Sequence, residues 1–260
     1  MDFFFSVIAG AIQGLTEFLP VSSTGHLIIL EAIFGLSPEK FGLAFDASLH
    51  LGTLLALAIF FFRDYLRALK DRNLLLKLTV GTIPAVVLGL AFESLIESTL
   101  RQILIVAGGL IIFSFVMLIA EKVNKKSKQK SQITIKDAFI MGVFQSIALI
   151  PGVSRSGSTI SGGLLLGLKR EEAARFAFLL SGPIIAGAGT KKFLEVLTAD
   201  ATGSSLGIFV IGISSSGIFG YLTIKYFLKY VSKNSLALFI IYRLILGFVL
   251  IVLALYSPSY

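Results

Sequence analysis

Long apolar runs alternate with short polar stretches along almost the whole chain. The runs are continuous and do not alternate residue by residue, which favours helices over the strands of a membrane barrel. A helix needs roughly 20 residues to cross about 30 Å of hydrocarbon. Six runs approach this length: 47–62, 79–96, 102–120, 173–193, 206–224 and 236–256. The pattern therefore predicts an all-α integral membrane protein with six transmembrane helices.

Two further segments, 3–37 and 137–168, contain apolar pieces that are broken by turns rich in Pro, Gly and Ser. The pieces are too short to form pairs of full spans, so each segment is expected to be a re-entrant helical hairpin. Non-helical backbone at membrane depth is tolerated only where protein buries it or water lines it. We therefore expect both turns to lie at an internal cavity.

Composition and charge agree with a multi-pass membrane protein. The mean hydropathy is +0.90 and 15% of the residues are charged, against about 25% in soluble domains. Basic residues gather in short stretches between apolar runs, which is typical of cytoplasmic loops. On this threading 17 of the 23 Lys and Arg residues are cytoplasmic, and Lys40, Arg101, Lys191 and Lys192 are outside. Membrane orientation thus explains the net charge of +8 without nucleic acid as a partner.

The two hairpin segments resemble each other. GAIQGLTEFLPVSSTGH aligns with GVFQSIALIPGVSRSGS at an offset of 132 residues, and three apolar runs follow each segment. The charge-based threading brings the two segments in from opposite sides of the membrane. We therefore predict a single membrane domain, 1–260, that is an inverted-topology repeat of 1–120 and 137–260.

Hairpins that enter from opposite faces can bring the turns VSSTGH and VSRSGS together. Arg155 offers a planar fork of donors that suits phosphate oxygens. Hydroxyls and backbone N–H groups near helix N-termini add further donors. Glu17 suits proton transfer, metal binding or the orientation of His26 or a water, and His26 can act as acid, base or nucleophile. These parts suit phosphoryl transfer.

Packing offers a competing explanation for part of this set, because Ser and Gly often serve only close contact between membrane helices. Arg155 and Glu17 resist that explanation, since ionisable groups at membrane depth are costly and usually functional. Arg243, in the last apolar run, is left open between structural pairing, snorkelling and a direct role. Charges at the rim of the site are expected at Glu31, Glu39 and Asp46.

QGLTEFLPVSSTGH and PGVSRSGST together resemble the undecaprenyl pyrophosphate phosphatases of the bacitracin-resistance type, over essentially the whole chain. The resemblance implies hydrolysis of a polyprenyl diphosphate lipid to the monophosphate and phosphate. This reaction recycles the carrier lipid for peptidoglycan synthesis and confers bacitracin resistance. The resemblance also implies a plasma-membrane location, contact with membrane lipids and an active site that opens to the extracellular or periplasmic side. It leaves a homodimer open.

The resemblance assigns catalytic positions to Glu17, Ser23, His26 and Arg155, and leaves the nucleophile open between Ser23, His26 and water. The family's first motif, (Glu/Gln)-x-x-x-Glu, is Gln13 and Glu17 here, so this chain has one acidic group fewer than some members. A divalent cation, Mg²⁺ or Ca²⁺, is therefore left open, with Glu17 as its candidate ligand. The candidate substrate-binding residues are Gln13, Ser22, Thr24, Gly25, Ser154, Ser156, Gly157 and Thr159.

A secondary transporter or lipid-phosphate flippase with the same inverted repeat is the alternative, because broken helices that meet at mid-membrane characterise transporters. The set of Glu, Ser, His and Arg favours an enzyme, since transport needs neither a nucleophile nor a proton shuttle.

Overall fold

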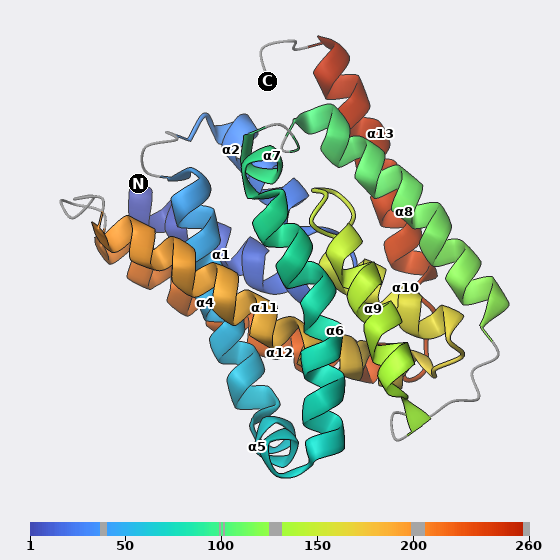
Figure 1. Cartoon of the computed structure of the whole chain (residues 1–260). Coiled ribbons are helices and arrows are strands. Elements are labelled where there is room, and N and C mark those ends of the chain that lie inside the picture. The colour runs from blue at the N-terminus through green and yellow to red at the C-terminus, as the bar shows by residue number, and fades with distance from the viewer. Residues whose placement is uncertain (37–40, 99, 101, 125–131, 199–205, 257–260) are drawn as a thin grey trace.

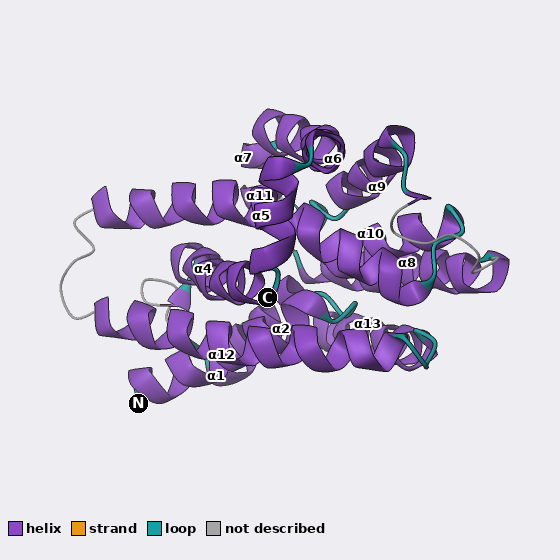
Figure 2. Ribbon diagram, turned by 90° about the horizontal axis from the view of Figure 1, so that it is seen from below, coloured by secondary structure: helices purple, strands orange, loops and turns teal. Residues whose placement is uncertain are grey.

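The computed structural model describes residues 1–36, 41–98, 100, 102–124, 132–198 and 206–256, which form α-helices joined by short turns (Figures 1 and 2). Within these residues, five helices are long and apolar enough to cross a membrane. They are α6 (Arg72–Ala91), α8 (Ile103–Val123), α11 (Arg170–Thr198), α12 (Leu206–Val231) and α13 (Ala237–Tyr256). The chain is therefore an all-helical, multi-span membrane protein, as its apolar runs predict.

The first predicted span is a bent pair of helices. α4 (Leu43–Phe60) and α5 (Phe62–Lys70) meet at an angle of 71°, and together they are long and apolar enough to form a sixth span. The predicted run 79–96 is also displaced, because α6 begins at Arg72 and a separate helix, α7 (Glu93–Ser98), follows it. The Asp71 carboxylate caps α6 by accepting hydrogen bonds from the backbone N–H groups of Asn73 and Leu74. The helix therefore starts in polar residues, which lie outside the apolar run seen in the sequence.

Each predicted hairpin segment contains two short helices around a turn. The first comprises α1 (Asp2–Phe18) and α2 (Ser23–Phe34), and the second comprises α9 (Ile135–Ile147) and α10 (Arg155–Leu165). α1 stops at Phe18 because Leu19 precedes a proline, and a residue in that position avoids helical torsion angles. Its backbone is accordingly extended, with φ −72° and ψ 143°.

Glycines let each hairpin pack on a helix far away in the sequence. α1 runs beside α12 (Figure 2), and a Cβ at Gly10 would lie 2.3 Å from the backbone oxygen of Gly212. α9 packs on α6 in a similar way, with a Cβ at Gly142 only 2.1 Å from the oxygen of Gly81. Neither position has space for a side chain. Glycine therefore allows the close approach of backbones that small residues permit between membrane helices.

Arg243 of α13 joins the two turns. Its side chain is fully buried and donates to the backbone oxygens of Pro20 at 3.2 Å and Gly152 at 3.0 Å. Its other acceptors lie on α8: the Ser114 hydroxyl and the backbone oxygens of Gly109 and Leu110. The guanidinium therefore has a structural role as a donor to backbone at both hairpin tips.

Replacing Arg243 with methionine is expected to lower stability by about 3 kcal/mol or more, because buried carbonyls that lose a donor cost about 1–3 kcal/mol each. The thermal unfolding midpoint in detergent measures this loss. Ile241→Ala is the matched control, since Ile241 lies on the same helix and is 56% exposed. An unchanged midpoint for Arg243→Met would contradict the structural role.

Candidate functional site

A polar cavity of about 60 Å³ lies where the two hairpin turns meet. Its lining comprises Glu17, Ser22, Ser23, Thr24, His50, Ala148, Ile150, Pro151, Gly152, Ser154 and Arg155. A second cavity of about 240 Å³ shares Thr24, His50, Ala148, Pro151 and Arg155 with it, and the rest of that lining is mostly apolar. A small polar chamber thus adjoins a larger cavity whose own lining is mostly apolar, a combination that suits a charged headgroup with a hydrocarbon chain.

Two helices begin at the polar chamber. α2 starts at Ser23 and α10 starts at Arg155, and both residues line the chamber. The first N–H groups of a helix have no partner within the helix and carry partial positive charge, so helix N-termini bind anions. The Ser154 hydroxyl accepts from the N–H of Gly157 at 3.2 Å in α10, whereas Ser22 makes no such bond in α2.

Ser22 and Ser154, the residues that precede these two helices, share an unusual backbone conformation. Both have φ of 72°, and they are the only non-glycine residues with positive φ in the described part of the chain. Such angles are uncommon for residues with a Cβ and cost of order 1–3 kcal/mol, and they concentrate at functional sites. The two positions aligned in the sequence repeat therefore make the same strained turn.

Glu17 is 7% exposed and lies at the end of α1. Its Oε2 accepts a hydrogen bond from the Ser23 hydroxyl at 2.8 Å and another from the Gln13 amide at 3.1 Å. Its Oε1 lies 3.5 Å from Nη1 of Arg155. A buried carboxylate needs such partners to remain charged, and the serine is within the reach that proton transfer requires.

Arg155 has a buried donor, Nη1, that the described part of the protein leaves without a hydrogen bond. Its Nη1 is buried and has no hydrogen-bond partner within the described residues, since the ion contact with Glu17 at 3.5 Å is not a hydrogen bond by geometry. Buried donors are nearly always satisfied in folded proteins. A ligand oxygen in the chamber would supply the missing acceptor.

Two of the predicted site residues lie beside the chamber. Gln13 is fully buried behind Glu17. His26 is absent from the lining of both cavities, and its ring nitrogens lie 2.7 Å from the oxygen of Ser22 and 2.6 Å from the Tyr242 hydroxyl. Both nitrogens of His26 are therefore engaged by the protein.

The remaining predicted residues hold the two turns in place. The Ser156 hydroxyl donates to the backbone oxygen of Leu19 at 2.8 Å and thereby links the hairpins. The Thr159 hydroxyl donates to the backbone oxygen of Arg155. Gly157 faces Pro20 of the other turn, where a Cβ would meet the proline at 3.3 Å. At Gly25, likewise, a Cβ would lie 3.1 Å from Val106.

Sequence reasoning missed His50 of α4. Its Nδ1 lies 3.0 Å from Nε2 of Gln13 and 3.6 Å from Oε2 of Glu17. Its position inside an apolar run could have identified His50 as a candidate, because ionisable residues within membrane spans are usually functional. The rim position expected for Asp46 is wrong: this residue is 6% exposed and lines the larger cavity. Glu39 lies outside the described residues.

A metal ion would find only part of its ligands among the described residues. No group of three or more His, Cys, Asp or Glu side chains that could hold a metal ion exists among the described residues. Mg²⁺ is commonly held by one or two carboxylates together with substrate phosphates and water. Glu17 fits as such a single protein ligand, and an ion shared with the substrate would neutralise phosphate charge.

Comparison with known proteins gives a consistent result. A family profile described as "Bacitracin resistance protein BacA" matches residues 6–249. A protein of Thermodesulfovibrio yellowstonii named undecaprenyl-diphosphatase is 46% identical over 253 residues, covering 97% of each chain. Proteins of the same name from Rubrobacter xylanophilus and Desulforudis audaxviator are each 42% identical, covering 93% and 98% of this chain and 94% and 99% of their own.

Proposed function

Because this chain belongs to the bacitracin resistance protein BacA family and is an undecaprenyl-diphosphatase, we propose that the diphosphate of its substrate binds in the polar chamber between Glu17 and Arg155. The observation that carries this proposal is the buried, unsatisfied Nη1 of Arg155 on the same 60 Å³ chamber as the Glu17–Ser23 pair. The adjoining 240 Å³ cavity receives the first part of the polyprenyl chain.

In this mechanism Arg155 and the N-termini of α2 and α10 bind the terminal phosphate and stabilise charge as the anhydride bond breaks. The Ser23 hydroxyl attacks that phosphorus and gives its proton to Glu17, while polyprenyl monophosphate leaves with the bridging oxygen. Glu17 passes this proton to the departing monophosphate. Water then attacks the phosphoserine and gives a proton to Glu17, which returns it to the Ser23 oxygen as the P–O bond to serine breaks and phosphate is released. The 2.8 Å hydrogen bond between Ser23 and Glu17 supports this assignment, because an activated nucleophile lies within hydrogen-bond reach of its base.

The proposed architecture is six transmembrane helices and two re-entrant hairpins, arranged as an inverted repeat of 1–120 and 137–260. Three observations support it: a helical hairpin followed by three candidate spans in both halves, with the bent pair α4–α5 taken as one span; the equal φ of Ser22 and Ser154; and the reciprocal glycine contacts of α1 with α12 and α9 with α6. In such a repeat, hairpins that enter from opposite faces form one site at their tips.

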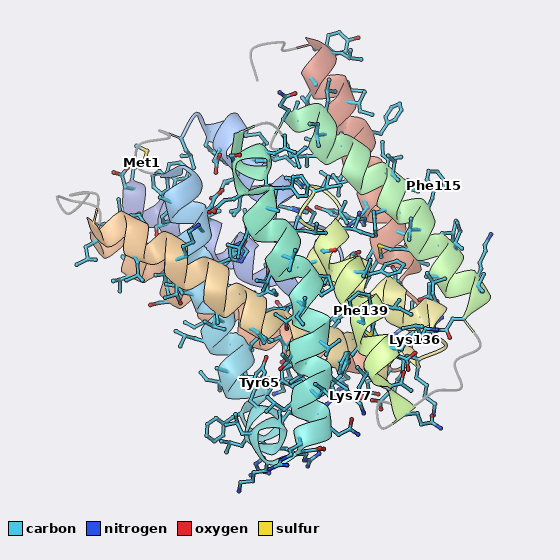
Figure 3. The ribbon with its side chains drawn as sticks, in the orientation of Figure 1. Met1, Tyr65, Lys77, Phe115, Lys136 and Phe139 are labelled. Atoms are coloured by element: carbon cyan, nitrogen blue, oxygen red, sulfur yellow. The ribbon has the colours of Figure 1, made fainter. Side chains whose placement is uncertain are left out.

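The chamber is proposed to open to the extracellular or periplasmic side. Met1 lies at the upper left in Figure 3, whereas Lys77 and Lys136, from two of the basic stretches, lie toward the opposite end. The bias of Lys and Arg in short loops sets orientation, with the basic end inside the cell. The diphosphate would then be hydrolysed on the outer side of the membrane.

Cysteine labelling tests this orientation, because the chain contains no cysteine of its own. A membrane-impermeant thiol reagent applied to intact cells should label Ala201→Cys and spare Ser127→Cys, and permeabilisation should then expose Ser127→Cys. Both positions lie outside the described residues, so the test depends on topology alone. Labelling of Ser127→Cys alone in intact cells would place the chamber on the cytoplasmic side.

Phosphate release from a polyprenyl diphosphate in detergent tests the proposed reaction. The assay is run with and without EDTA, which shows whether the reaction needs a divalent cation. The wild-type protein should release phosphate and form the monophosphate, and Ser23→Ala should not. A flippase would move lipid between leaflets without this release, so detergent, which removes the leaflets, separates the two functions. Full activity of Ser23→Ala would overturn the proposed nucleophile.

A further inference from the structure

We infer that His50 is a positioning residue for the reaction, acting on Glu17 through the Gln13 amide; this inference rests on the proposed function. His50 belongs to neither sequence motif and comes from α4, whose residues lie between the two hairpins in the sequence. It lines both the polar chamber and the larger cavity. Its ring is therefore placed at the junction of headgroup and chain sites.

The contacts of Gln13 define how His50 is used. The amide nitrogen of Gln13 lies 3.1 Å from Oε2 of Glu17 and 3.0 Å from Nδ1 of His50. An amide nitrogen carries two hydrogens and cannot accept, so both neighbours act as acceptors. If the Gln13 amide were turned by 180°, its oxygen would face the Glu17 carboxylate, and two acceptors would repel each other. Nδ1 of His50 is therefore the acceptor that holds the Gln13 amide in line with Glu17.

This network compensates for the uncharged residue at position 13. Gln13 cannot transfer a proton, yet its two N–H groups tie His50 to the same Glu17 oxygen that receives the Ser23 hydroxyl. The charged groups around this ring are Glu17 at 3.6 Å, Arg155 across the shared chamber, and Asp46, one turn earlier on α4 and in the same larger cavity. Loss of the Nδ1 acceptor would free the amide to rotate and would misalign Glu17 with Ser23.

Two isosteric variants test the inference. Asparagine places its side-chain oxygen near the position of Nδ1, whereas glutamine places its amide near Nε2. His50→Asn should therefore keep kcat within about threefold of wild type. His50→Gln should lower kcat about tenfold or more, as is typical when an outer partner of a site residue is lost. KM should change little in either variant, because Arg155 and the N-termini of α2 and α10, which are proposed to bind the phosphate, are unchanged.

The effect of the two His50 variants can be compared with and without the Gln13 amide, which separates a positioning role of His50 from structural support alone. In a Gln13→Leu background the Asn and Gln variants should become equal, since the amide that they contact is gone. Leu55→Gln, on an exposed face of the same helix, is the control for a polar change in α4. Thermal midpoints of the paired variants show whether both fold, and equal midpoints are expected because both side chains are polar and similar in size.

The outcomes distinguish this inference from the proposed function. If Glu17→Gln is inactive but His50→Gln retains wild-type kcat, the role of His50 is overturned and the site stands. A greater loss in His50→Asn than in His50→Gln also overturns it, because the acceptor would then lie at Nε2. If Glu17→Gln retains full activity, the proposed site itself fails.

Discussion

Arg155→Ala is expected to lower the rate of phosphate release about a hundredfold or more while leaving the protein folded. The arginine is a cation at the polar chamber with an unsatisfied Nη1. Loss of a charge-assisted contact to the phosphate in this largely buried site should raise the barrier by about 3 kcal/mol or more. Initial rates with a polyprenyl diphosphate in detergent measure the effect.

Arg155→Lys should recover little of this loss, because an ammonium group lacks the planar fork that binds two phosphate oxygens. Arg63→Ala is the matched control, since that arginine is exposed and distant in the sequence from both turns. Near-wild-type release by a folded Arg155→Ala protein would remove Arg155 from the site.

Glu17→Gln is expected to lower the rate about a thousandfold, within the range of 10² to 10⁴ that positioned proton transfer contributes. The amide is almost the same size as the carboxylate, but it cannot take the proton of Ser23, to which Glu17 is hydrogen-bonded at 2.8 Å. Comparison of kcat at saturating substrate isolates the chemical step from binding.

Gln13→Ala provides the control for this prediction. Gln13 contacts the same oxygen of Glu17 but only positions it, so its loss should be milder, near tenfold. The assignment of the carboxylate role fails if Gln13→Ala is the more damaging change.

The break at the first turn and the location of both turns at a cavity could be predicted from the sequence, because local physical rules determine them. A proline after an apolar helix ends that helix, as at Leu19, and charged residues at membrane depth need a protein-lined cavity. Ser22 and Ser154, which align in the sequence repeat, have the same φ of 72° in the structure. Glu17, Ser23 and Arg155 accordingly line one chamber.

Contacts between distant helices could not be predicted in the same way. The link from His50 to Gln13 depends on how α4 lies against α1, and no local pattern encodes that position. Arg243 was left open because an isolated arginine in a span gives no sign of its acceptors, which prove to be backbone oxygens of both turns. His26 lies in the motif, yet its contacts with Ser22 and Tyr242 turn both ring nitrogens toward protein groups.

The central claim is that turns from the two halves of the chain enclose one reacting phosphate. Thr24 of the first turn and Ala148 of the second both line the polar chamber, and the chain has no cysteine to interfere with labelling. A short reducible cross-linker can therefore join Thr24→Cys to Ala148→Cys across that chamber. Each single-cysteine variant, treated with the same reagent, controls for modification without closure.

The decisive measurement is the rate of phosphate release by this double variant before linking, after linking and after reduction. The account predicts that linking abolishes release, that bound polyprenyl diphosphate protects against linking, and that reduction restores the original rate. Release at an undiminished rate by fully linked protein would contradict the claim, because the substrate would then react somewhere other than between the two turns.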